Sequence, residues 1–421
     1  MTSREESPPL SDQARGPDHL ERRLRFGVIG CGYWGPHLVR NVHEIPEAEL
    51  VAVSDLQQER LEAMGLRYPG IRLFRDHQDL LAADVDAVVV ASPIHTHHAL
   101  VRDALLAGKH VLVEKPLATS AQQAADLVTL ARQRRRVLMV GHTFVFNPAV
   151  QELGRLVDAG ELGRIYHGDA ARLNLGLFQR HANVLWDLAP HDISILVQVL
   201  GQDPVMVSAR GSACVQADVH DVCYLEIQFS AGASAHVHVS WLDPDKVRRL
   251  TLVGDRRMAV FDDVSAHAKL RIYDRGVEPP APDGRGEAAV AYRNGEIVIP
   301  YIERQEPLRL ECEHFVDCVR RGRRPLSDGK QGLIVVATLE AADRSLRNGG
   351  TLVPVEMPLL ATTGRGAAHR NGNGAHPNGN GTHSNGNGVH LNENGVHSNG
   401  NGTHPRDARS SSGQARVAGG A

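Results

Sequence analysis

Short apolar runs alternate with helical patterns between Leu24 and about Gly141. The runs are rich in β-branched residues and apolar almost throughout, as parallel strands covered on both faces are. They comprise Arg25–Ile29, Leu50–Ser54, Ala87–Ala91, His110–Glu114 and Val137–Val140. A capping box, Ser120-x-x-Gln123, marks the start of one intervening helix. The alternation predicts an α/β Rossmann domain with a doubly wound parallel sheet over residues 24–143.

After Thr143 the pattern changes to strands with few helices between them. The expected helices are Pro148–Ala159, Pro190–Leu200, Leu308–Arg320 and Gly329–Arg347. The expected strands are Ile165–Leu173, Val205–Arg210, Val222–Phe229, Ala235–Trp241, Arg249–Val253 and Met258–Phe261. This order predicts an α+β domain with a mainly antiparallel, open-faced sheet over residues 144–360. We expect this domain to carry the substrate and oligomerisation surfaces.

The two ends of the chain differ in composition from both domains. Residues 1–23 are charged and contain Pro8, Pro9 and Pro17. Beyond residue 360 a histidine recurs every seven residues from His369 to His404, in Asn/Gly-rich units without the apolar seam of a coiled coil. Such segments bury too little surface to offset chain entropy, so we expect a disordered leader (1–23) and tail (361–421). Weak metal binding by the histidines is the alternative; we expect a solvated linker and no metal site.

Charge and cysteine usage exclude several classes of protein. The 421 residues carry a formal net charge of -3 at pH 7, so no global field recruits nucleic acid or an anionic membrane. No apolar run reaches the roughly 18 residues that a membrane span needs. No apolar export segment follows Arg22-Arg23, and the five cysteines form no CxxC pair. We therefore expect a cytoplasmic protein that binds neither nucleic acid nor membrane.

A glycine-rich turn follows the first predicted strand and precedes a helix. In G-x-G-x-x-G, Gly30 permits the tight turn, Gly32 lets the backbone approach a pyrophosphate, and Gly35 lets helix and strand pack closely. Asp55 ends the next strand, where a carboxylate accepts hydrogen bonds from ribose hydroxyls and repels a 2′-phosphate. No arginine follows at once in Leu56-Gln57-Gln58. These features predict NAD as the cofactor, with NADP disfavoured; a packing turn beside a capping aspartate is the alternative.

Two places can supply the proton acceptor and the alkoxide-stabilising donor that hydride transfer from a carbinol needs. Lys115, in Glu114-Lys115-Pro116, lies at the C-terminal end of a predicted strand, where doubly wound sheets bind ligands. A plain surface lysine is the alternative. Asp187 and His191 lie at the predicted start of the helix from Pro190, where the helix dipole disfavours an imidazolium. An N-terminal cap plus a hydrogen-bonded histidine is the alternative there.

With these motifs the sequence resembles the glucose–fructose oxidoreductase / inositol dehydrogenase / rhizopine-catabolism (Gfo/Idh/MocA) family. The stretches that carry the resemblance are Ala91–His97, Ala107–Leu117 and Asp187–His191, and it covers about residues 24–357. It implies a dehydrogenase in which Lys115 and His191 meet the reacting hydroxyl. His191 is then the general acid and base, Lys115 donates to the alkoxide, and Asp187 sets orientation and local charge.

The resemblance also implies a set of residues that surround the cofactor. They are Tyr33, Trp34, Ser92, Pro93, His95, His97, Glu114 and Lys115, beside the glycine turn. For His97 and His98 the alternative is that each simply opens a helix. We expect substrate contacts from Asn147, Arg172, Asn174 and Trp186. Arg172 can bind a phosphate or carboxylate through both arms of its guanidinium, or lie in an ion pair on the sheet.

The substrate class follows from similarities within the family. Val145 departs from the arginine that many inositol-type members carry at this position. The stretches Tyr33–Pro36, Gly141–Phe144 and Leu173–Gly176 are similar to relatives associated with nucleotide-sugar and surface-polysaccharide synthesis. The resemblance thus implies oxidation of a nucleotide-sugar ring hydroxyl, often at C3. A free cyclitol or hexose dehydrogenase and a catalytically silent NAD-binding regulatory protein are the alternatives. A homodimer or homotetramer is expected, because relatives pair through the open sheet face.

Overall fold

The computed structural model describes residues 22–176, 178, 182–278 and 291–360. The predicted tail and residues 1–21 of the predicted leader lie outside the described residues. The last two leader residues are held by the first domain. Arg22 pairs with Asp86, and the Arg23 guanidinium donates to the carbonyl of Ala48. These two contacts lie just before the predicted boundary at Leu24.

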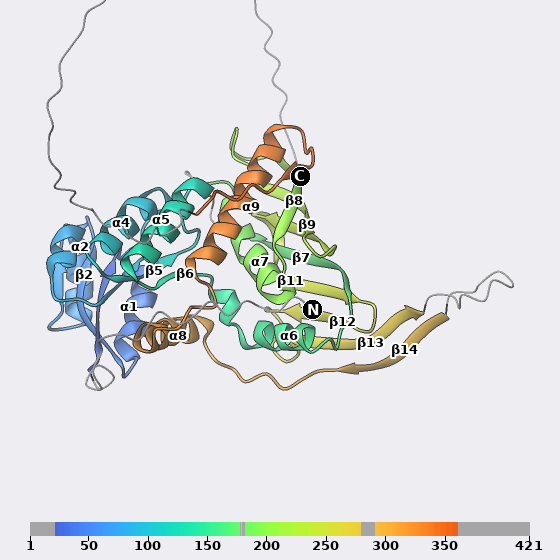
Figure 1. Cartoon of the computed structure of the whole chain (residues 1–421), viewed down its shortest axis with the longest axis horizontal. Helices are drawn as coiled ribbons and strands as arrows, with labels where there is room; N and C mark the ends of the chain where they lie inside the picture. Colours follow the sequence, from blue (N-terminus) through green and yellow to red (C-terminus); the bar gives the residue numbers. More distant parts are fainter. Residues whose placement is uncertain (1–21, 177, 179–181, 279–290, 361–421) are drawn as a thin grey trace, which may run out of the picture. The chain divides into compact units, whose positions relative to one another are not determined.

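The first part of the chain forms a parallel sheet with helices between its strands (Figure 1). Within the described residues it has six strands in the order β3-β2-β1-β4-β5-β6. The strands are β1 (Leu24–Ile29), β2 (Ala48–Ser54), β3 (Arg72–Phe74), β4 (Ala87–Val90), β5 (His110–Glu114) and β6 (Leu138–Gly141). The helices are α1 (Gly35–Glu44), α2 (Gln58–Arg67), α3 (His77–Ala82), α4 (Ile94–Leu106) and α5 (Ala121–Arg134). The predicted doubly wound parallel sheet is confirmed.

Burial on both faces explains why these strands have continuous apolar sequences. All four residues of β4 are fully buried. The short edge strand β3 was not predicted, since Arg72 and Leu73 are exposed and leave no apolar run. Ser120 caps α5 as predicted, because its hydroxyl accepts from the amide of Gln123 at 3.2 Å. The strand order reverses between β1 and β4, and such a switch point is where open α/β sheets bind ligands.

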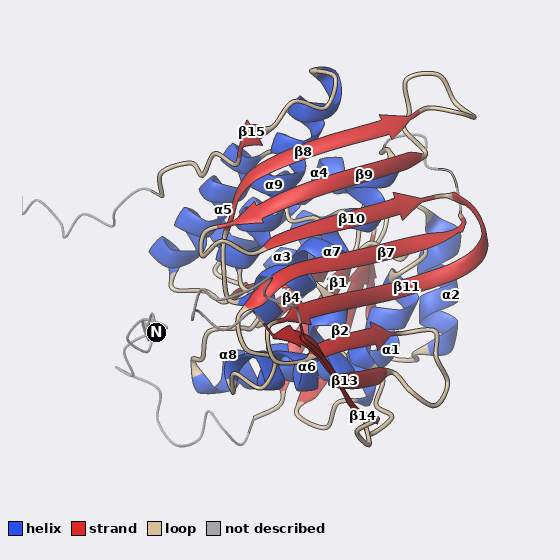
Figure 2. Cartoon of the chain, turned by 90° about the vertical axis from the view of Figure 1, so that its right-hand side faces the viewer, coloured by secondary structure: helices blue, strands red, loops and turns tan. Residues whose placement is uncertain are grey.

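The second part of the chain forms a largely antiparallel sheet (Figure 2). Within the described residues it has nine strands in the order β14-β13-β12-β11-β7-β10-β9-β8-β15, of which only β10 and β7 pair in parallel. The strands are β7 (Ile165–Leu175), β8 (Pro204–Ser212), β9 (Val222–Phe229), β10 (Ser234–Ser240), β11 (Leu242–Gly254), β12 (Met258–Asp262), β13 (Leu270–Glu278), β14 (Ala291–Val298) and β15 (Val353–Pro354). The last three were not predicted, and β14 shows why: nearly all its side chains are exposed, so they do not alternate.

One face of this sheet is covered by helices and the other is open. Figure 2 shows β8, β9, β10, β7 and β11 side by side, with α7 (Val184–Leu200) and α9 (Gly329–Arg347) behind them. Along β9 the buried residues Leu225 and Ile227 alternate with the exposed Tyr224 and Glu226. The predicted open-faced α+β sheet is confirmed.

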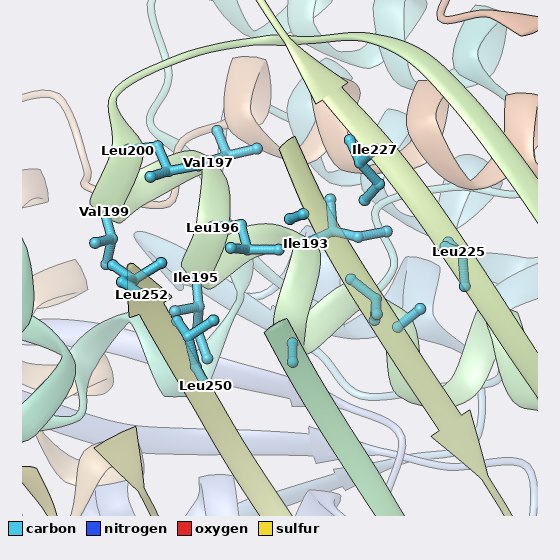
Figure 3. Close-up of a cluster of buried hydrophobic side chains, with 14 of the residues drawn as sticks. Ile193, Ile195, Leu196, Val197, Val199, Leu200, Leu225, Ile227, Leu250 and Leu252 are labelled. Atoms are coloured by element: carbon cyan, nitrogen blue, oxygen red, sulfur yellow. The ribbon is translucent and has the colours of Figure 1, made fainter. Parts of the chain in front are cut away.

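Helix α7 supplies the centre of the second core. Its side chains Ile193 and Leu196 pack with Leu225 of β9 and Leu250 of β11 (Figure 3). The predicted start of this helix at Pro190 is wrong. The helix begins at Val184, where the Asn183 side chain accepts from the Trp186 amide at 3.2 Å, and Pro190 lies inside the helix. Complete burial of Val184, Leu185 and Ala189 offsets the cost of an interior proline, about 3 kcal/mol.

The two late helices return to the first sheet. Helix α8 (Pro307–Arg321) packs against α1, and the Phe315 and Phe26 rings meet edge to face at 6.0 Å (Figure 1). Helix α9 contacts α5 and α7. The remaining helices are α6 (Pro148–Asp158) and the 3-10 turn η2 (Thr143–Phe146), which follows β6. Among the described residues no helix combines the length and apolarity that crossing a membrane requires.

Candidate active site

The glycine turn has the geometry of a phosphate cradle. Gly30 has a φ of +97°, and a Cβ there would lie 2.5 Å from the carbonyl oxygen of Ala91. A Cβ at Gly35 would collide with the carbonyl of Gly30. A Cβ at Gly32 would meet nothing nearer than Arg60, at 3.6 Å, so the backbone there stays open to a ligand. The first and third glycines are thus needed for packing, and the second leaves room for a pyrophosphate.

Asp55 lies at the end of β2 beside this cradle, and its side chain is only 7% exposed. One carboxylate oxygen accepts from the Cys31 amide at 2.7 Å, and the other accepts from the Gln57 amide at 2.8 Å. The carboxylate therefore fixes the glycine turn. Although no arginine follows directly in sequence, α2 brings the Arg60 guanidinium to 3.6 Å from Asp55. The sequence does not reveal this neighbour, because Arg60 lies beyond the three residues that directly follow Asp55 and reaches it from α2.

Two large aromatic side chains flank the turn. Tyr33 is 75% exposed and Trp34 is 49% exposed, and their rings meet edge to face at 5.6 Å. Adjacent exposed apolar side chains can form part of a ligand-binding surface. The pair therefore suits contact with a bound molecule.

The segment after β4 forms the opposite side of the cradle. Pro93 and His95 are exposed, whereas Ser92 is half-buried and bonds through its hydroxyl to Thr96 at 2.7 Å. His97 is buried, and its two ring nitrogens lie 2.8 Å from the carbonyls of Pro116 and Ser92. His97 thus ties the segment after β4 to the turn after β5, and burial lowers its pKa.

Lys115 and Asp187 meet across 72 residues of sequence. The Lys115 ammonium donates to the Asp187 backbone carbonyl at 2.7 Å and lies 3.3 Å from a side-chain oxygen. The other Asp187 oxygen accepts from the indole of Trp241 at 3.1 Å. Sequence analysis missed Trp241; the signal was that a buried tryptophan needs an acceptor for its N–H. The two motifs predicted separately thus form one constellation at the carboxyl end of β5.

His191 lies one turn further along α7, and its ring meets that of Phe144 edge to face at 5.1 Å. Burial, followed by the charges of Lys115 and Arg172, lowers its pKa well below the usual value. The imidazole is therefore neutral and able to accept a proton. The predicted cause was wrong: His191 lies in the middle of α7, so burial and neighbouring cations act on it rather than the helix N-terminus.

Two further titratable side chains, Glu114 and His142, lie near Lys115, and a third, Glu311, lies near Glu114. Burial raises the pKa of Glu114 to about 7, although Lys115 opposes this. Burial lowers the pKa of His142 to about 3, with a contribution from Lys115. Glu311 of α8 is fully buried, and burial together with Glu114 raises its pKa well above the usual value. Sequence analysis missed both His142 and Glu311. For Glu311 the reason is that nothing in the local sequence links α8 to this site.

The four predicted substrate contacts divide into two kinds. Arg172 is buried and donates twice to Asp192, at 2.8 and 3.0 Å, so the structure shows the ion-pair alternative. Asn147 is also buried, capping α6 through the Ala149 amide and donating to Asp263. Asn174 and Trp186 are half-buried and stay accessible. The last two therefore suit substrate contact better than the first two.

The residues present fit a bound NAD. The cradle leaves room where a pyrophosphate lies, a carboxylate ends the second strand, and the lysine–aspartate–histidine constellation stands at the same edge of the sheet. Fold and site together define an NAD-dependent oxidoreductase.

Comparison with known protein families supports the same class. Residues 24–142 match the family model described as "Oxidoreductase family, NAD-binding Rossmann fold", and residues 150–260 match the GFO/IDH/MocA C-terminal domain. The chain belongs to the Gfo/Idh/MocA oxidoreductase family, as the resemblance implied, and is an NAD-dependent dehydrogenase.

Individual relatives act on different substrates. The chain is 30% identical to UDP-N-acetylglucosamine 3-dehydrogenase of Acidithiobacillus ferrooxidans over 75% of its length and 94% of the relative's. It is 31% identical to inositol 2-dehydrogenase 2 of Saccharopolyspora erythraea over 79% of its length and 96% of the relative's. The crystal structure of GenD2 from gentamicin A biosynthesis, in complex with NAD, is similar with a TM-score of 0.67 and 27% identity. That likeness covers 81% of this chain and 98% of GenD2.

Proposed function

We propose that this dehydrogenase oxidises a ring hydroxyl of a nucleotide-sugar, at C3, with NAD. The observation that carries the substrate class is the environment of Val145. It is fully buried in the core cluster that contains Phe26 and Phe315, where many inositol-type members carry an arginine. The valine side chain contacts the core, so this chain has no guanidinium at that position to bind a cyclitol hydroxyl. The similarity to UDP-N-acetylglucosamine 3-dehydrogenase supports the same class.

In this proposal the cofactor lies along the edge of the first sheet. Gly30, Gly32 and Gly35 hold its pyrophosphate, and Asp55 accepts from a ribose hydroxyl. The remaining contacts come from Tyr33, Trp34, Ser92, Pro93, His95, Glu114 and Lys115, while His97 holds the two loops together. When bound, NAD supplies the acceptor for the hydride that leaves the sugar carbon.

The chain's own residues handle the proton. His191, neutral because it is buried beside cations, accepts the proton of the hydroxyl as general base. The Lys115 ammonium stabilises the developing alkoxide by charge and hydrogen bonding. Asp187 holds that ammonium through its carbonyl and carboxylate, and Trp241 fixes the carboxylate. Lys115 is therefore oriented before substrate arrives.

A substrate panel tests the proposal. Reduction of NAD is followed with UDP-N-acetylglucosamine and its uronic acid against myo-inositol and free glucose. Turnover of a UDP-sugar at least about a hundredfold faster than inositol supports the nucleotide-sugar class. Faster turnover of inositol would overturn the proposal and favour the cyclitol alternative. The 31% identity to an inositol dehydrogenase supports that alternative.

We infer an NAD-binding domain over residues 24–143 and a substrate and oligomerisation domain over 144–360. On the open face of the second sheet the Tyr224 ring stacks on His238 at 4.3 Å, with Tyr224 55% exposed. We expect this face to pair copies into a homodimer or homotetramer. Light scattering of a Tyr224→Glu variant, against the wild type, tests it.

A further inference from the structure

We propose that Arg248 of β11 binds an anionic group of the substrate, either the diphosphate of the nucleotide-sugar or a carboxylate on the sugar. Its guanidinium lies beside Phe144, the ring against which His191 packs. The inference rests on the proposed function and deepens it, because it assigns the residue that recognises the charge of the substrate. The sequence offered Arg172 for this role, and the structure places a more accessible arginine next to it.

Strand pairing places the two arginines side by side. Arg248 of β11 lies directly opposite Arg172 of β7, so both side chains project from the same face of the sheet. Leu250, two residues further along β11, is buried in the core under that face, opposite the buried Ala170. Arg248 therefore projects toward the helices, as Arg172 does.

One aromatic ring lies next to both arginines and to the proposed general base. The guanidinium carbons of Arg172 and Arg248 lie 4.3 and 5.3 Å from the centre of the Phe144 ring. The His191 ring meets the same ring edge to face, with 5.1 Å between the ring centres. A sugar whose hydroxyl reaches His191 therefore lies close enough for an anionic substituent to meet Arg248.

The two guanidiniums differ in how much of each is left for a ligand. Arg172 is 4% exposed and donates to both oxygens of Asp192, at 2.8 and 3.0 Å. Arg248 is 34% exposed and reaches Asp263 through one nitrogen, at 3.4 Å. Among the described residues no second acceptor lies within hydrogen-bond distance of the Arg248 guanidinium. Because a guanidinium has five N–H donors, most of those on Arg248 remain for a ligand.

The counter-ion of Arg248 is shared with other donors. The Asp263 carboxylate accepts from the Asn147 amide group at 3.1 Å and lies 3.4 Å from the Lys269 ammonium, which also donates to the Asp263 carbonyl at 2.6 Å. Two arginines and one lysine thus share two carboxylates, which leaves an excess of positive charge. Burial and then the charge of Arg172 lower the pKa of Arg248, as expected of a cation with too little counter-charge. A bound anion supplies that charge.

Room for the rest of a nucleotide lies beside this ion pair. Asp263, Ser265 and Lys269 line a cavity of about 490 Å³. The segment between β14 and α8 forms its other side, where the Tyr301 side chain is 90% exposed. Small-molecule sites commonly have volumes of roughly 300–1,000 Å³, and an exposed aromatic ring is a surface on which a base stacks. The cavity therefore favours the diphosphate as the anion, with the nucleoside beyond it.

The test removes the charge of Arg248 and compares the result with a matched arginine. Arg257→Gln is the control, since Arg257 is 42% exposed and pairs through one nitrogen with Glu161 at 3.6 Å. We expect Arg248→Gln to raise KM for UDP-N-acetylglucosamine about 10- to 100-fold, as loss of a charged hydrogen bond does. Its kcat should stay within about threefold of wild type, because the lost contact holds substrate and transition state alike. The control should change neither constant.

Binding of UDP alone separates this inference from the proposed reaction. Calorimetry is done with saturating NAD, which occupies the glycine turn, so that UDP reports on the proposed site. We expect the affinity for UDP to fall about 10- to 100-fold in Arg248→Gln and to stay unchanged in Arg257→Gln. Arg248→Lys, which keeps the charge but loses the fork of donors, should bind UDP with intermediate affinity, and it serves as the test if the glutamine variant does not fold.

The outcomes distinguish the two anions and the two proposals. A rise in KM confined to the uronic acid of UDP-N-acetylglucosamine, with UDP affinity unchanged, assigns the carboxylate as the ligand of Arg248. Unchanged UDP affinity together with unchanged KM for both sugars would overturn the proposal. If UDP binds through Arg248 but no sugar reduces NAD, the proposed function fails while the anion site stands.

Discussion

Helix α7 carries two carboxylates that pair with cations in opposite ways. Asp192 and Arg172 are each 4% exposed and are joined by two hydrogen bonds of 2.8 and 3.0 Å. Asp187 and Lys115 are 26% and 14% exposed and share one side-chain contact of 3.3 Å. The first pair is joined through two guanidinium nitrogens, whereas in the second the ammonium uses two of its three donors on Asp187 and leaves one to meet a ligand.

The difference separates a structural pair from a functional one. Arg172 stacks on the Phe144 ring at 4.3 Å, and the same ring touches His191. The buried pair therefore supports Phe144, against which the proposed catalytic histidine His191 packs. From sequence, Arg172 was either a substrate contact or an ion-pair partner, and the family resemblance implied that Lys115 donates to the alkoxide; partner geometry distinguishes the two.

The largest expected effect is on Lys115. Lys115→Met should lower kcat by about 10²–10⁴-fold, because the alkoxide loses its charged donor. Stability should stay near wild type, since the pair with Asp187 is partly exposed. Lys330→Met, on the exposed face of α9, is the control. Retained turnover in the Lys115 variant would show that Lys115 is not the donor to the alkoxide.

The two aspartates should differ in stability. Asp192→Asn should lower the free energy of unfolding by about 3–5 kcal/mol, because it leaves the buried Arg172 charge uncompensated. Asp187→Asn keeps an acceptor for Trp241 and should cost less than about 1 kcal/mol, while kcat falls. Urea denaturation of both variants measures the contrast. Equal losses of stability would mean that the two pairs are alike.

A third carboxylate, that of Asp55, is also buried. It accepts hydrogen bonds from two backbone amides in addition to lying near a cation. Asp55→Ala should raise KM for NAD about tenfold, as loss of a charged hydrogen bond does, and change NADP use less. Asp79→Ala, exposed in α3, serves as the control. Equal effects on both cofactors would show that Asp55 supports the turn without meeting the ribose.

The smallest effect concerns Glu114, whose pKa of about 7 lies above the usual 4.5. Folding favours its neutral form, so its contribution to stability is present below about pH 4.5 and is lost as pH rises through 7. The unfolding free energy of wild type minus that of Glu114→Gln should therefore decrease across this window. A difference in unfolding free energy that rises with pH would contradict the raised pKa of Glu114.

Sequence patterns predicted what is local and periodic. The glycine turn, Asp55 and the buried strands of the first sheet follow from spacing, because each depends on neighbours within a few dozen residues. The start of α7 was misplaced, since proline usually opens a helix and burial of Val184 and Leu185 overrides this. Trp241 and Glu311 were missed because their partners, Asp187 and Thr143, come from distant elements. Arg172 could not be assigned for the same reason: its role depends on Asp192, which lies across the core.

The most direct measurement follows the hydrogen itself. UDP-N-acetylglucosamine carrying deuterium at C3 is incubated with the protein and NAD, and the reduced cofactor is analysed by mass spectrometry. The account predicts deuterium in the reduced cofactor of the wild type and no detectable reduction with Lys115→Met. Reduced cofactor without deuterium would contradict oxidation at C3, and reduction undiminished in the Lys115 variant would contradict the assigned site.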